Sequence, residues 1–442
     1  MFERAQNVLA GGVNGDIKYW EPYPIFLSSA NGSRVKDVDG NEYIDYVLSY
    51  GALILGHGHR VIRDAISELV ESYGTTLFGN PSPLEVEFGQ LLLDTYMKDG
   101  RVRFTNSGLE ATLLAVRLAK AFTGKTKIAK FDGHYHGANP FLLSNYKIEG
   151  AKKDSQRTEK KPDSPEVTGH LLEELVVLPF NDIEGSKKIL EAEGSRLAAV
   201  ILEPFEDGYI PADKEFMSFL RSYTEEKGIL LIFDEVKTGF RVRVGGAAEY
   251  YRVKPDIACL GKVIGGGVPV GAVIGTSDIM DLLNPKTKTG RHVFHSGTFN
   301  GNPLSMTLGM ATVKEITSNG NFDRLKGLSD ELRAGISTVL SEFGVDHQLY
   351  GEGGIVNYTL GEKRIKTRRD LPYELLKARK DIDSLLLKEG VYVIPGSRLS
   401  LSLAHTEVDV EATINALRSA VRTLLAKPVN PLKKTLASRL KA

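Results

Sequence analysis

Asp234 and Lys262 each follow a predicted buried strand, and together they could support covalent amine chemistry. Asp234 closes the apolar run 230–233, and Lys262 closes the run 257–260. An acid after a strand is most often a helix cap or turn residue, but the spacing leaves room for one helix and a return strand, which would bring both side chains to one sheet edge. A half-buried lysine can form a Schiff base, and an aspartate can keep a pyridine nitrogen protonated. The pair therefore predicts pyridoxal chemistry.

Two turns rich in glycine and hydroxyl groups are candidates for binding a phosphate. In the first, Ser107 and Glu110 match the S-x-x-E capping box at the start of a helix predicted over 109–120. Such caps are common, but Gly108 would also let a phosphate approach the backbone N–H groups of the helix start. The second turn, residues 295–303, also precedes a predicted helix.

The segment 131–137 follows another predicted strand and carries Tyr135 between two histidines. The histidines lack companion ligands at the usual spacing, so we predict no metal site. Tyr135 could instead stack on a flat cofactor ring. Two nucleotide-loop look-alikes are rejected: 124–126 closes a helix and lacks the earlier glycine, and 56–58 lacks the later one.

These residues are expected at the strand ends of an α/β domain. From about residue 60 to 310, short β-rich runs alternate with helical stretches, which favours a mostly parallel sheet with helices on its faces. The candidate strands are 102–105, 127–131, 198–202, 229–233, 257–260 and 272–274. Before them, residues 34–47 are predicted to form a hairpin. After them, helical stretches surround short strands near 354–359 and 391–394.

The chain length and this change of pattern predict two domains. A large domain is expected over 60–310, and a small α+β domain over 311–442 together with the N-terminal segment 1–59. The charged run within 147–170 is predicted to be a long loop, either a surface excursion or an active-site lid. The basic end, 433–442, is predicted to be a solvated helix.

Bulk composition excludes several classes of protein. The 56 basic and 56 acidic residues cancel, so the basic footprint of a nucleic-acid-binding protein is missing. No apolar run approaches the length of a membrane span, and no signal peptide is recognisable. Cys259 is the one cysteine, which excludes an internal disulfide and fits a reducing compartment. We expect a cytoplasmic protein that binds neither nucleic acid nor membrane.

With these residues in view, the chain resembles the class III aminotransferases of fold type I, which depend on pyridoxal phosphate, and within them the glutamate-1-semialdehyde 2,1-aminomutases. The resemblance runs over nearly the whole chain and rests on the order and spacing of short motifs. The motifs are Gly11-Gly12-Val13-Asn14, Asp37-Val38-Asp39-Gly40, Leu55-Gly56-His57, Asn106-Ser107-Gly108, Tyr135-His136-Gly137, Glu203-Pro204, Asp234-Glu235-Val236, Thr238-Gly239-Phe240-Arg241, Leu260-Gly261-Lys262, Gly297-Thr298 and Gly301-Asn302-Pro303. It implies a large domain with a mostly parallel seven-stranded sheet and a small α+β domain.

The resemblance also implies roles for individual residues in binding pyridoxal 5'-phosphate. Lys262 would form the Schiff base and shuttle the proton, and Asp234 would bind the pyridine nitrogen. The remaining residues implied to contact the ring, its phenolic side or the phosphate are Ser107, Gly108, Leu109, Tyr135, His136, Glu203, Val236 and Thr298. Thr298 would reach the phosphate held by a partner subunit, so the resemblance implies a homodimer with shared active sites.

The substrate region departs from the aminomutase pattern. The aminomutases usually continue Gly-Gly-Val-Asn with Ser-Pro-Val-Arg, whose serine and arginine hold the substrate carboxylate, whereas residues 15–18 are Gly-Asp-Ile-Lys. Gly208 stands where they have an asparagine. Residues 396–400 lack the acid of their Phe-Glu-Ala stretch, and Ser49-Tyr50-Gly51 resembles their Ser-Trp-Gly. The candidate substrate residues are Lys18, Tyr50, Arg241 and Arg398.

Three reactions use the same cofactor residues and stay open as interpretations. We predict an aminotransferase that moves an amino group from a small amino donor to a separate carbonyl acceptor, because the substrate grip of the aminomutases is missing. The alternatives are the aminomutase reaction within one molecule and amino-acid racemisation. A non-enzyme relative would be expected to lack Lys262 or Asp234, and both are present. The aromatic residues Tyr19, Trp20 and Tyr23 indicate a flatter substrate or simply pack the N-terminal segment.

Overall fold

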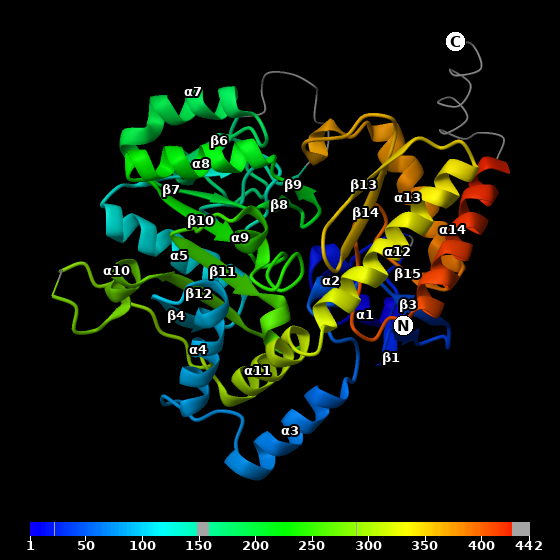
Figure 1. Ribbon diagram of the computed structural model, residues 1–442, viewed down its shortest axis with the longest axis horizontal. Helices are drawn as coiled ribbons and strands as arrows, with labels where there is room; N and C mark the ends of the chain where they lie inside the picture. The colour runs from blue at the N-terminus through cyan, green and yellow to red at the C-terminus, as the bar shows by residue number, and fades with distance from the viewer. Residues whose placement is uncertain (22, 148–158, 289, 427–442) are drawn as a thin grey trace.

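A computed structural model of the chain describes residues 1–21, 23–147, 159–288 and 290–426, and a seven-stranded sheet lies at its centre (Figure 1). In sheet order the strands are β4 (Gly100–Thr105), β12 (Gly271–Thr276), β11 (Ile257–Gly261), β10 (Leu230–Asp234), β7 (Leu197–Leu202), β5 (Lys127–Phe131) and β6 (Leu175–Leu178). β12 runs antiparallel to both of its neighbours, and the other neighbouring strands are parallel. The predicted fold class, α/β with a mostly parallel sheet, is confirmed.

The six strands predicted between residues 60 and 310 all lie in this sheet, with ends shifted by at most two residues. β6 was not among them. Its sequence, Leu-Val-Val-Leu, is a four-residue buried run, and so short an apolar run has no periodicity that separates a strand from a buried helix.

Helices cover both faces of the sheet. α5 (Gly108–Thr123) packs on one face through a row of fully buried residues that includes Ala111, Ala115 and Ala119. Their small side chains let the helix approach the strands closely. α7 (Ile183–Glu193) and α8 (Lys214–Lys227) cover the other face, with Phe216 and Leu220 in a second core (Figure 1). The helix predicted over 109–120 lies within α5, which begins one residue earlier.

The two ends of the chain meet in a smaller sheet of four strands. In order these are β1 (Leu27–Asn31), β2 (Arg34–Asp37), β3 (Glu42–Asp45) and β15 (Val391–Tyr392). β2 and β3 form the predicted hairpin, and the Asp37 carboxylate accepts the backbone N–H groups of Asp39 and Asn41 in its turn. β15 pairs in parallel with β3. This pairing supports the proposed grouping of residues 1–59 with 311–442.

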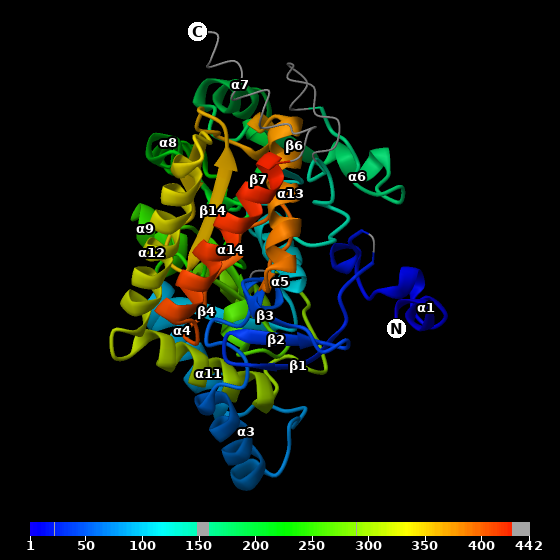
Figure 2. The same cartoon turned by 90° about the vertical axis from the view of Figure 1, so that its right-hand side faces the viewer.

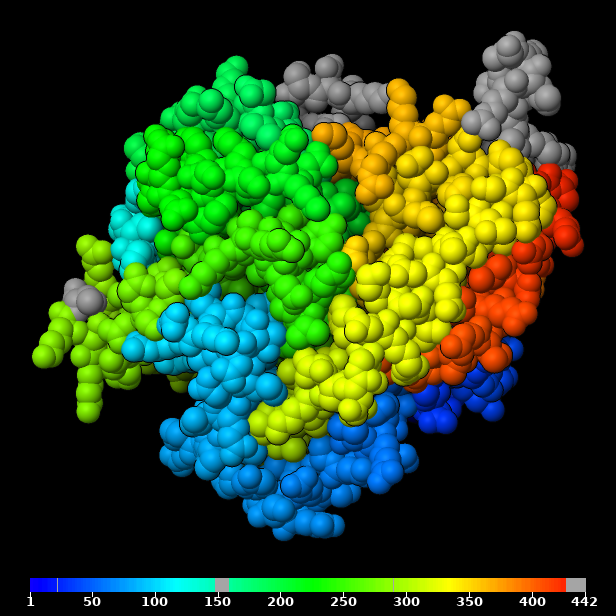
Figure 3. Space-filling model, viewed as in Figure 1, coloured from blue at the N-terminus to red at the C-terminus, as the bar shows by residue number. Residues whose placement is uncertain are grey.

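The C-terminal elements complete the small domain. β13 (His347–Tyr350), β14 (Ile355–Leu360) and β16 (Leu399–Ser400) form a sheet beside α12 (Asn321–Glu342), α13 (Tyr373–Lys388) and α14 (Glu407–Ala426) (Figure 2). In the space-filling view these elements, yellow to red, abut the green surface of the large sheet's domain (Figure 3). The helix predicted for 433–442 lies outside the described residues, as does 148–158 of the predicted loop.

The remaining elements connect these parts. They are α1 (Phe2–Gln6), α2 (Leu48–Gly51), α3 (Arg60–Tyr73), α4 (Pro83–Tyr96), α6 (Gly169–Glu173), α9 (Gly246–Tyr251), α10 (Ser277–Met280), α11 (Pro303–Thr317) and the short hairpin β8 (Phe205–Glu206) and β9 (Ile210–Pro211). Among the helices of the described residues, none is long and apolar enough to cross a membrane.

A buried ion pair on α13 fixes the segment that leads to Arg398. Arg379 Nε donates to both carboxylate oxygens of Asp383 at 2.9 Å, and its guanidinium lies 3.5 Å from the ring centroid of Tyr358. The same pair holds the backbone of the 396–398 turn, because Asp383 accepts the N–H of Gly396 at 2.7 Å and Arg379 donates to the carbonyl of Ser397 at 3.1 Å.

Asp383→Ala should destabilise the protein by about 3–5 kcal/mol, because removing one partner leaves the Arg379 charge buried and unpaired. The measurement is the urea unfolding midpoint of the variant against the unaltered protein at one cofactor concentration. Lys377→Ala, at an exposed position of the same helix, is the control and should change the midpoint little. Equal midpoints for Asp383→Ala and the control would show that the pair does not stabilise the fold.

Candidate active site

Lys262 and Asp234 lie at the carboxyl ends of two neighbouring parallel strands. β10 ends at Asp234 and β11 ends at Gly261, directly before Lys262, and Asp234 is in register with Cys259. Lys262 adopts a left-handed backbone conformation with φ of 50°. Such a conformation in a residue other than glycine is uncommon and is found most often at functional sites. The structure therefore brings together the two residues from which the prediction began.

The environment of Lys262 favours its neutral amine. Burial lowers the pKa of this amine to about 8, and the positive charges of Lys237 and Arg398 add to the effect, while Asp234 and Glu203 oppose it. A neutral amine is the nucleophilic form, and a lysine whose pKa is lowered by burial and neighbouring cations is suited to attack on a carbonyl carbon.

Asp234 is held at both carboxylate oxygens. Its Oδ1 accepts the backbone N–H of Val236 at 3.1 Å, and its Oδ2 lies 2.8 Å from Nδ1 of His136. Both side chains are buried. His136, which was expected to bind the cofactor, contacts the carboxylate in this structure, so it can fix the orientation of Asp234. Its other ring nitrogen, Nε2, is buried with no partner among the described residues.

The turn after β5 is joined to the end of β7 through Glu203. Glu203 is buried, its Oε2 accepts the backbone N–H of Tyr135 at 2.8 Å, and its own N–H donates to Nδ1 of His134 at 3.0 Å. Burial lowers the pKa of His134 well below its usual value, and its ring packs 4.5 Å from that of Phe180. His134 therefore acts as a neutral structural residue that holds Glu203 and the Tyr135 turn together.

The predicted phosphate turn lies at the start of α5. Ser107 caps this helix, with its Oγ accepting the N–H of Glu110 at 3.1 Å. The reciprocal half of the predicted capping box is wrong, because the Glu110 carboxylate accepts the N–H of Asn106 at 2.7 Å instead. Leu109 follows in the first turn and is partly exposed. The backbone N–H groups of a helix's first turn have no partners within the helix and can bind an anion.

Close packing explains the glycine at position 108. A Cβ on Gly108 would lie 2.8 Å from both methyl groups of Val236, and a Cβ on Gly261 would lie 3.4 Å from the same side chain. The helix start, the strand end that carries Lys262 and Val236 are therefore in direct contact. This grouping of an amine, a carboxylate and a helix N-terminus fits the carbonyl, the ring nitrogen and the phosphate of pyridoxal phosphate.

Thr298 lies on an exposed loop, flanked by Phe294 and Phe299, which are 70% and 59% exposed. The loop is tied to the phosphate turn, because Asn106 Nδ2 donates to Oδ1 of Asn300 at 2.7 Å. Large exposed aromatic side chains beside a candidate site mark a surface suited to an interface. In the single chain, Thr298 itself faces outward.

Two of the predicted substrate residues meet above the site. Arg398 donates through Nη1 to the backbone carbonyl of Asp207 at 3.0 Å and to its Oδ1 at 3.3 Å, and through Nη2 to the carbonyl of Tyr50 at 3.2 Å. The Tyr50 hydroxyl donates to the carbonyl of Ile17 at 2.9 Å. This bond brings the N-terminal segment with exposed Lys18 beside Tyr50.

Arg241 has a structural role in this chain, and the substrate role expected for it stays a prediction. Its side chain is fully buried and donates to the carbonyls of Gly51 at 2.8 Å, Leu401 at 2.7 Å and Gly354 at 3.4 Å. Burial lowers the pKa of its guanidinium to about 9. Arg241 therefore joins the large domain to small-domain segments through Nε and Nη1, while its Nη2 is buried with no hydrogen-bond partner among the described residues.

Two of the three N-terminal aromatic residues pack against other rings of the chain. Trp20 stacks on Tyr392 with ring centroids 5.6 Å apart, Tyr19 lies 6.1 Å from the ring of Phe2, and Tyr23 is exposed. Of the two interpretations given to them, the structure favours packing over substrate binding.

Sequence reasoning missed Lys237 and Asp207. Both are largely enclosed, with side chains 11% and 18% exposed, and Lys237 Nζ lies 2.7 Å from Oε1 of Glu203 and 2.9 Å from Oδ1 of Asp207. One signal was available: Lys237 directly follows the Asp-Glu-Val motif at a strand end, where a lysine needs a partner. The partner lies on the β8–β9 turn, about thirty residues earlier in the chain, and no local pattern indicates that contact.

The residue directly before the predicted loop, Tyr146, packs against Tyr135. The ring of Tyr146 lies 4.8 Å from that of Tyr135, and the N–H groups of Tyr146 and Lys147 donate to the carboxylate of Asp163 at 2.9 Å. Segment 148–158, on which a lid function depends, is outside the described residues, so the lid stays a prediction.

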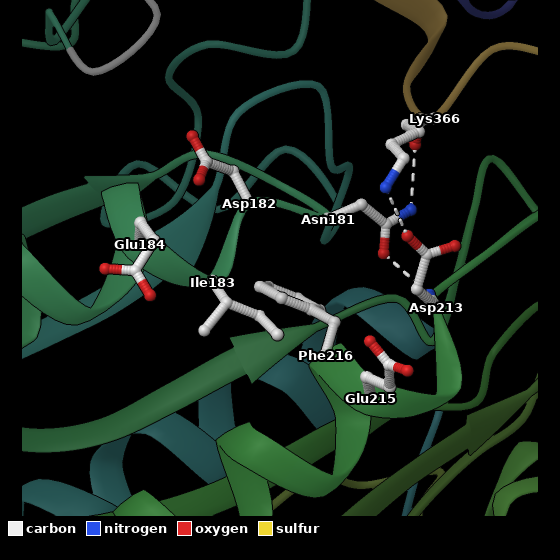
Figure 4. A pocket seen from close by; sticks show the side chains of 8 residues that line it. All are labelled: Asn181, Asp182, Ile183, Glu184, Asp213, Glu215, Phe216 and Lys366. Carbon is white, nitrogen blue, oxygen red and sulfur yellow. Dashed lines mark hydrogen bonds and ion pairs between the residues drawn. The ribbon is translucent and has the colours of Figure 1, made fainter.

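A separate surface hollow of about 250 Å³ lies at the starts of α7 and α8 (Figure 4). Its lining residues are Asn181, Asp182, Ile183, Glu184, Asp213, Glu215, Phe216 and Lys366. Lys366 pairs with Asp213 at 2.7 Å across it. None of the candidate site residues lines this hollow, so it is distinct from the site at the sheet edge.

Comparison with known proteins gives a consistent result. The family model described as aminotransferase class-III matches residues 18–421. Glutamate-1-semialdehyde 2,1-aminomutase of Natranaerobius thermophilus is 39% identical over 95% of this chain and 96% of the relative, and that of Methanothermobacter thermautotrophicus is 37% identical over 96% and 98%. Among solved structures, an omega-transaminase from Sphaerobacter thermophilus is 35% identical with a TM-score of 0.89, covering 95% of this chain and 96% of its own. A β-phenylalanine aminotransferase from Variovorax paradoxus is 29% identical with a TM-score of 0.84, covering 96% and 93%.

The lowered pKa of Lys262 predicts its reactivity. In protein freed of cofactor, acetylation of Lys262 by acetic anhydride should rise with pH, reach half of its limiting rate near pH 8 and level off about one to two pH units higher, since the neutral amine is the reactive form. Peptide mass spectrometry measures the rate, and Lys188, exposed on α7, is the internal standard for the reagent. A Lys262 rate that still rises steeply through pH 10 would contradict the lowered pKa.

Proposed function

The chain belongs to the class III aminotransferase family, and from this membership we propose that it moves an amino group between two separate small molecules, at least one of which carries a carboxylate. It is an enzyme, and its cofactor is pyridoxal phosphate, as in the PLP-bound transaminase that shares its fold. The observation that carries the proposal is Arg398, whose charge lies close enough to Lys262 to lower its pKa and which contacts Asp207 and Tyr50.

The residues at the sheet edge have distinct tasks in this proposal. Bound pyridoxal phosphate supplies an electron sink that stabilises negative charge on the carbon bearing the amino group. Lys262 would hold the cofactor covalently, and its Nζ would then carry a proton to and from that carbon. The Asp234 carboxylate would hold a proton at the ring nitrogen. His136 and the Val236 N–H keep that carboxylate in one orientation.

The other cofactor contacts follow from the packing of the strand ends. Ser107, Gly108 and Leu109 offer the start of α5 to the phosphate, and the tight contact of Gly108 with Val236 keeps that side chain in place beside the helix start. Tyr135 would stack on the ring face opposite Val236. Glu203, which holds the Tyr135 backbone, would support the phenolic side.

The substrate region favours transfer between separate molecules. The aminomutase pattern has an acid in the segment that holds residues 396–400 and an asparagine where Gly208 stands. Here Arg398 and Gly208 are in contact, since a Cβ on Gly208 would lie 3.4 Å from Cδ and Nε of Arg398. The two departures from the pattern, Gly208 and the 396–400 segment, thus form one feature. A basic side chain lies in the segment where the pattern has an acid. A guanidinium recognises a carboxylate through paired hydrogen bonds, so an acidic substrate is the ligand of choice.

The aminomutase reaction is the second candidate. The observation that favours it is the name of the relatives, since those that match at 37–39% identity over nearly the full chain are glutamate-1-semialdehyde 2,1-aminomutases. The same Lys262 and Asp234 would serve a reaction within one molecule. Racemisation would use them too, but no observation at this site favours it.

A homodimer with shared sites and a cytoplasmic location belong to the same proposal. Exposed Thr298, with Phe294 and Phe299 beside it, would face a second copy of the chain and reach its phosphate. The single cysteine, Cys259, is buried and free, which suits a reducing compartment.

The cofactor assignment predicts two results. Borohydride reduction of the yellow enzyme should fix the cofactor's mass on the peptide that contains Lys262 and on no other.

Asp234→Asn should still bind cofactor but slow amino transfer by roughly 10²–10³-fold, the usual loss when one preorganised electrostatic group is removed. Asp278→Asn, at an exposed position, should leave the rate unchanged. Near-normal turnover of Asp234→Asn would remove the carboxylate from the mechanism.

The discriminating assay gives the enzyme glutamate-1-semialdehyde alone and, separately, amino donors with keto-acid acceptors. We expect amino transfer between the separate molecules and little 5-aminolevulinate. Arg398→Met should raise the half-saturating concentration of an acidic substrate by about tenfold, the equivalent of ~1.4 kcal/mol. Efficient formation of 5-aminolevulinate with no transfer between molecules would establish the aminomutase reaction instead.

A further inference from the structure

Lys237 is a largely enclosed cation, and none of the roles described so far includes it. Its side chain is 11% exposed, and its ammonium lies 2.7 Å from Oε1 of Glu203 and 2.9 Å from Oδ1 of Asp207. It also lies 5.7 Å from the ring centroid of Tyr135. Lys237 therefore connects the carboxylate that holds the Tyr135 turn to the carboxylate that holds Arg398.

Three cations surround the Asp207 carboxylate. Lys237 contacts Oδ1 at 2.9 Å, Arg398 contacts the same oxygen at 3.3 Å, and Arg368 lies 3.9 Å from Oδ2. Burial would raise the pKa of Asp207, but these cations, with Lys237 first, hold it well below its usual value. Asp207 is therefore an anion, and its single negative charge faces three positive charges.

The charges nearby do not cancel this excess. Glu203 is shared with Lys237, and burial raises the pKa of Glu206 to about 8, so Glu206 adds little negative charge near neutral pH. Two anions, Glu203 and Asp207, thus face the three cations Lys237, Arg368 and Arg398. A positive charge in excess within a largely buried cluster favours an anionic ligand.

The contacts of Arg398 suit exchange between two partners. Its bonds run to the carbonyl and carboxylate of Asp207 and to the carbonyl of Tyr50. Its stem packs against Gly208, where a Cβ would lie 3.4 Å from Cδ and Nε of Arg398, so the missing side chain leaves room for the arginine. A substrate carboxylate could accept two hydrogen bonds from the same guanidinium. The obstacle is Asp207, which would lose one partner when Arg398 turns away.

We propose that Lys237 is a specificity-determining residue that lets Arg398 leave Asp207 for a substrate carboxylate, because Lys237 stays on Asp207 throughout and keeps that buried carboxylate paired. The inference rests on the proposed function, in which Arg398 receives the carboxylate. Without Lys237, Asp207 would depend on Arg398 and on the more distant Arg368. Leaving an enclosed charge without a close partner is strongly unfavourable. Arg398 would therefore stay on Asp207 and would not bind the substrate carboxylate.

The test uses two unreactive probes of the same shape, 3-phenylpropanoate and 3-phenylpropanamide, bound to the cofactor-loaded enzyme and followed by calorimetry. The unaltered enzyme should prefer the carboxylate. Lys237→Met should weaken carboxylate binding by about tenfold, corresponding to ~1.4 kcal/mol, and change amide binding by less than about twofold. Lys237→Arg keeps the charge and should retain the preference. The double variant, Asp207→Asn with Lys237→Met, should regain carboxylate binding, since the amide at 207 has no charge to leave unpaired.

Each outcome decides between the proposals. Lys237→Met with an undiminished carboxylate preference, or with equal losses for both probes, would overturn the role of Lys237 and leave the proposed function standing. No preference for the carboxylate in the unaltered enzyme would overturn the proposed function, and the role of Lys237 with it. If Lys237→Met does not fold, Asp207→Asn is compared with the double variant. Equal carboxylate binding supports the proposal, and weaker binding by the double variant overturns it.

Discussion

The parallel pairing of β10 with β11 is the contact on which the rest of the site depends. It sets Asp234 and Lys262 at the same edge of the sheet, at the ends of two adjacent strands. Since parallel strands end together, the two ends of a pyridoxal ring can be held by residues far apart in the chain. The neighbouring strands β5 and β7 then add Tyr135 and Glu203 at the same edge. α5 adds its N-terminus from the adjoining turn after β4.

Burial of this sheet edge makes the Lys262 amine reactive, and it also makes each charged group there costly in free energy. It lowers the pKa of Lys262 to about 8, and it requires that each charge that remains has a partner. His136 and Asp234, Glu203 and Lys237, and Asp207 and Arg398 meet this requirement in pairs. The pairs follow one another from the cofactor residues to the substrate residues. Charges from all three pairs act on Lys262, since Lys237 and Arg398 lower its pKa while Asp234 and Glu203 oppose them.

The small domain takes part in the site through its backbone. Arg379 and Asp383 hold the 396–398 turn, and Arg241 donates to the carbonyls of Gly354 and Leu401 from the other side. Arg398 thus extends from a segment that is fixed at both ends, while its own guanidinium is held by exchangeable contacts. A fixed backbone and a guanidinium with exchangeable contacts suit a residue that is proposed to bind a substrate carboxylate.

The sequence by itself determined the fold class and the cofactor and indicated the residues proposed to hold it, because each leaves a local trace: apolar runs that end in Asp234 and Lys262, and a glycine before a helix at 108. The seventh strand, β6, left too short a trace to be recognised. Only the tertiary structure decided what the arginines do. Arg241 and Arg398 read alike in the sequence, yet one donates to backbone carbonyls and the other contacts the Asp207 carboxylate near Lys262. The same holds for Lys237, since a buried charge is defined by partners that lie about thirty residues away in the chain and meet it only when the sheet has formed.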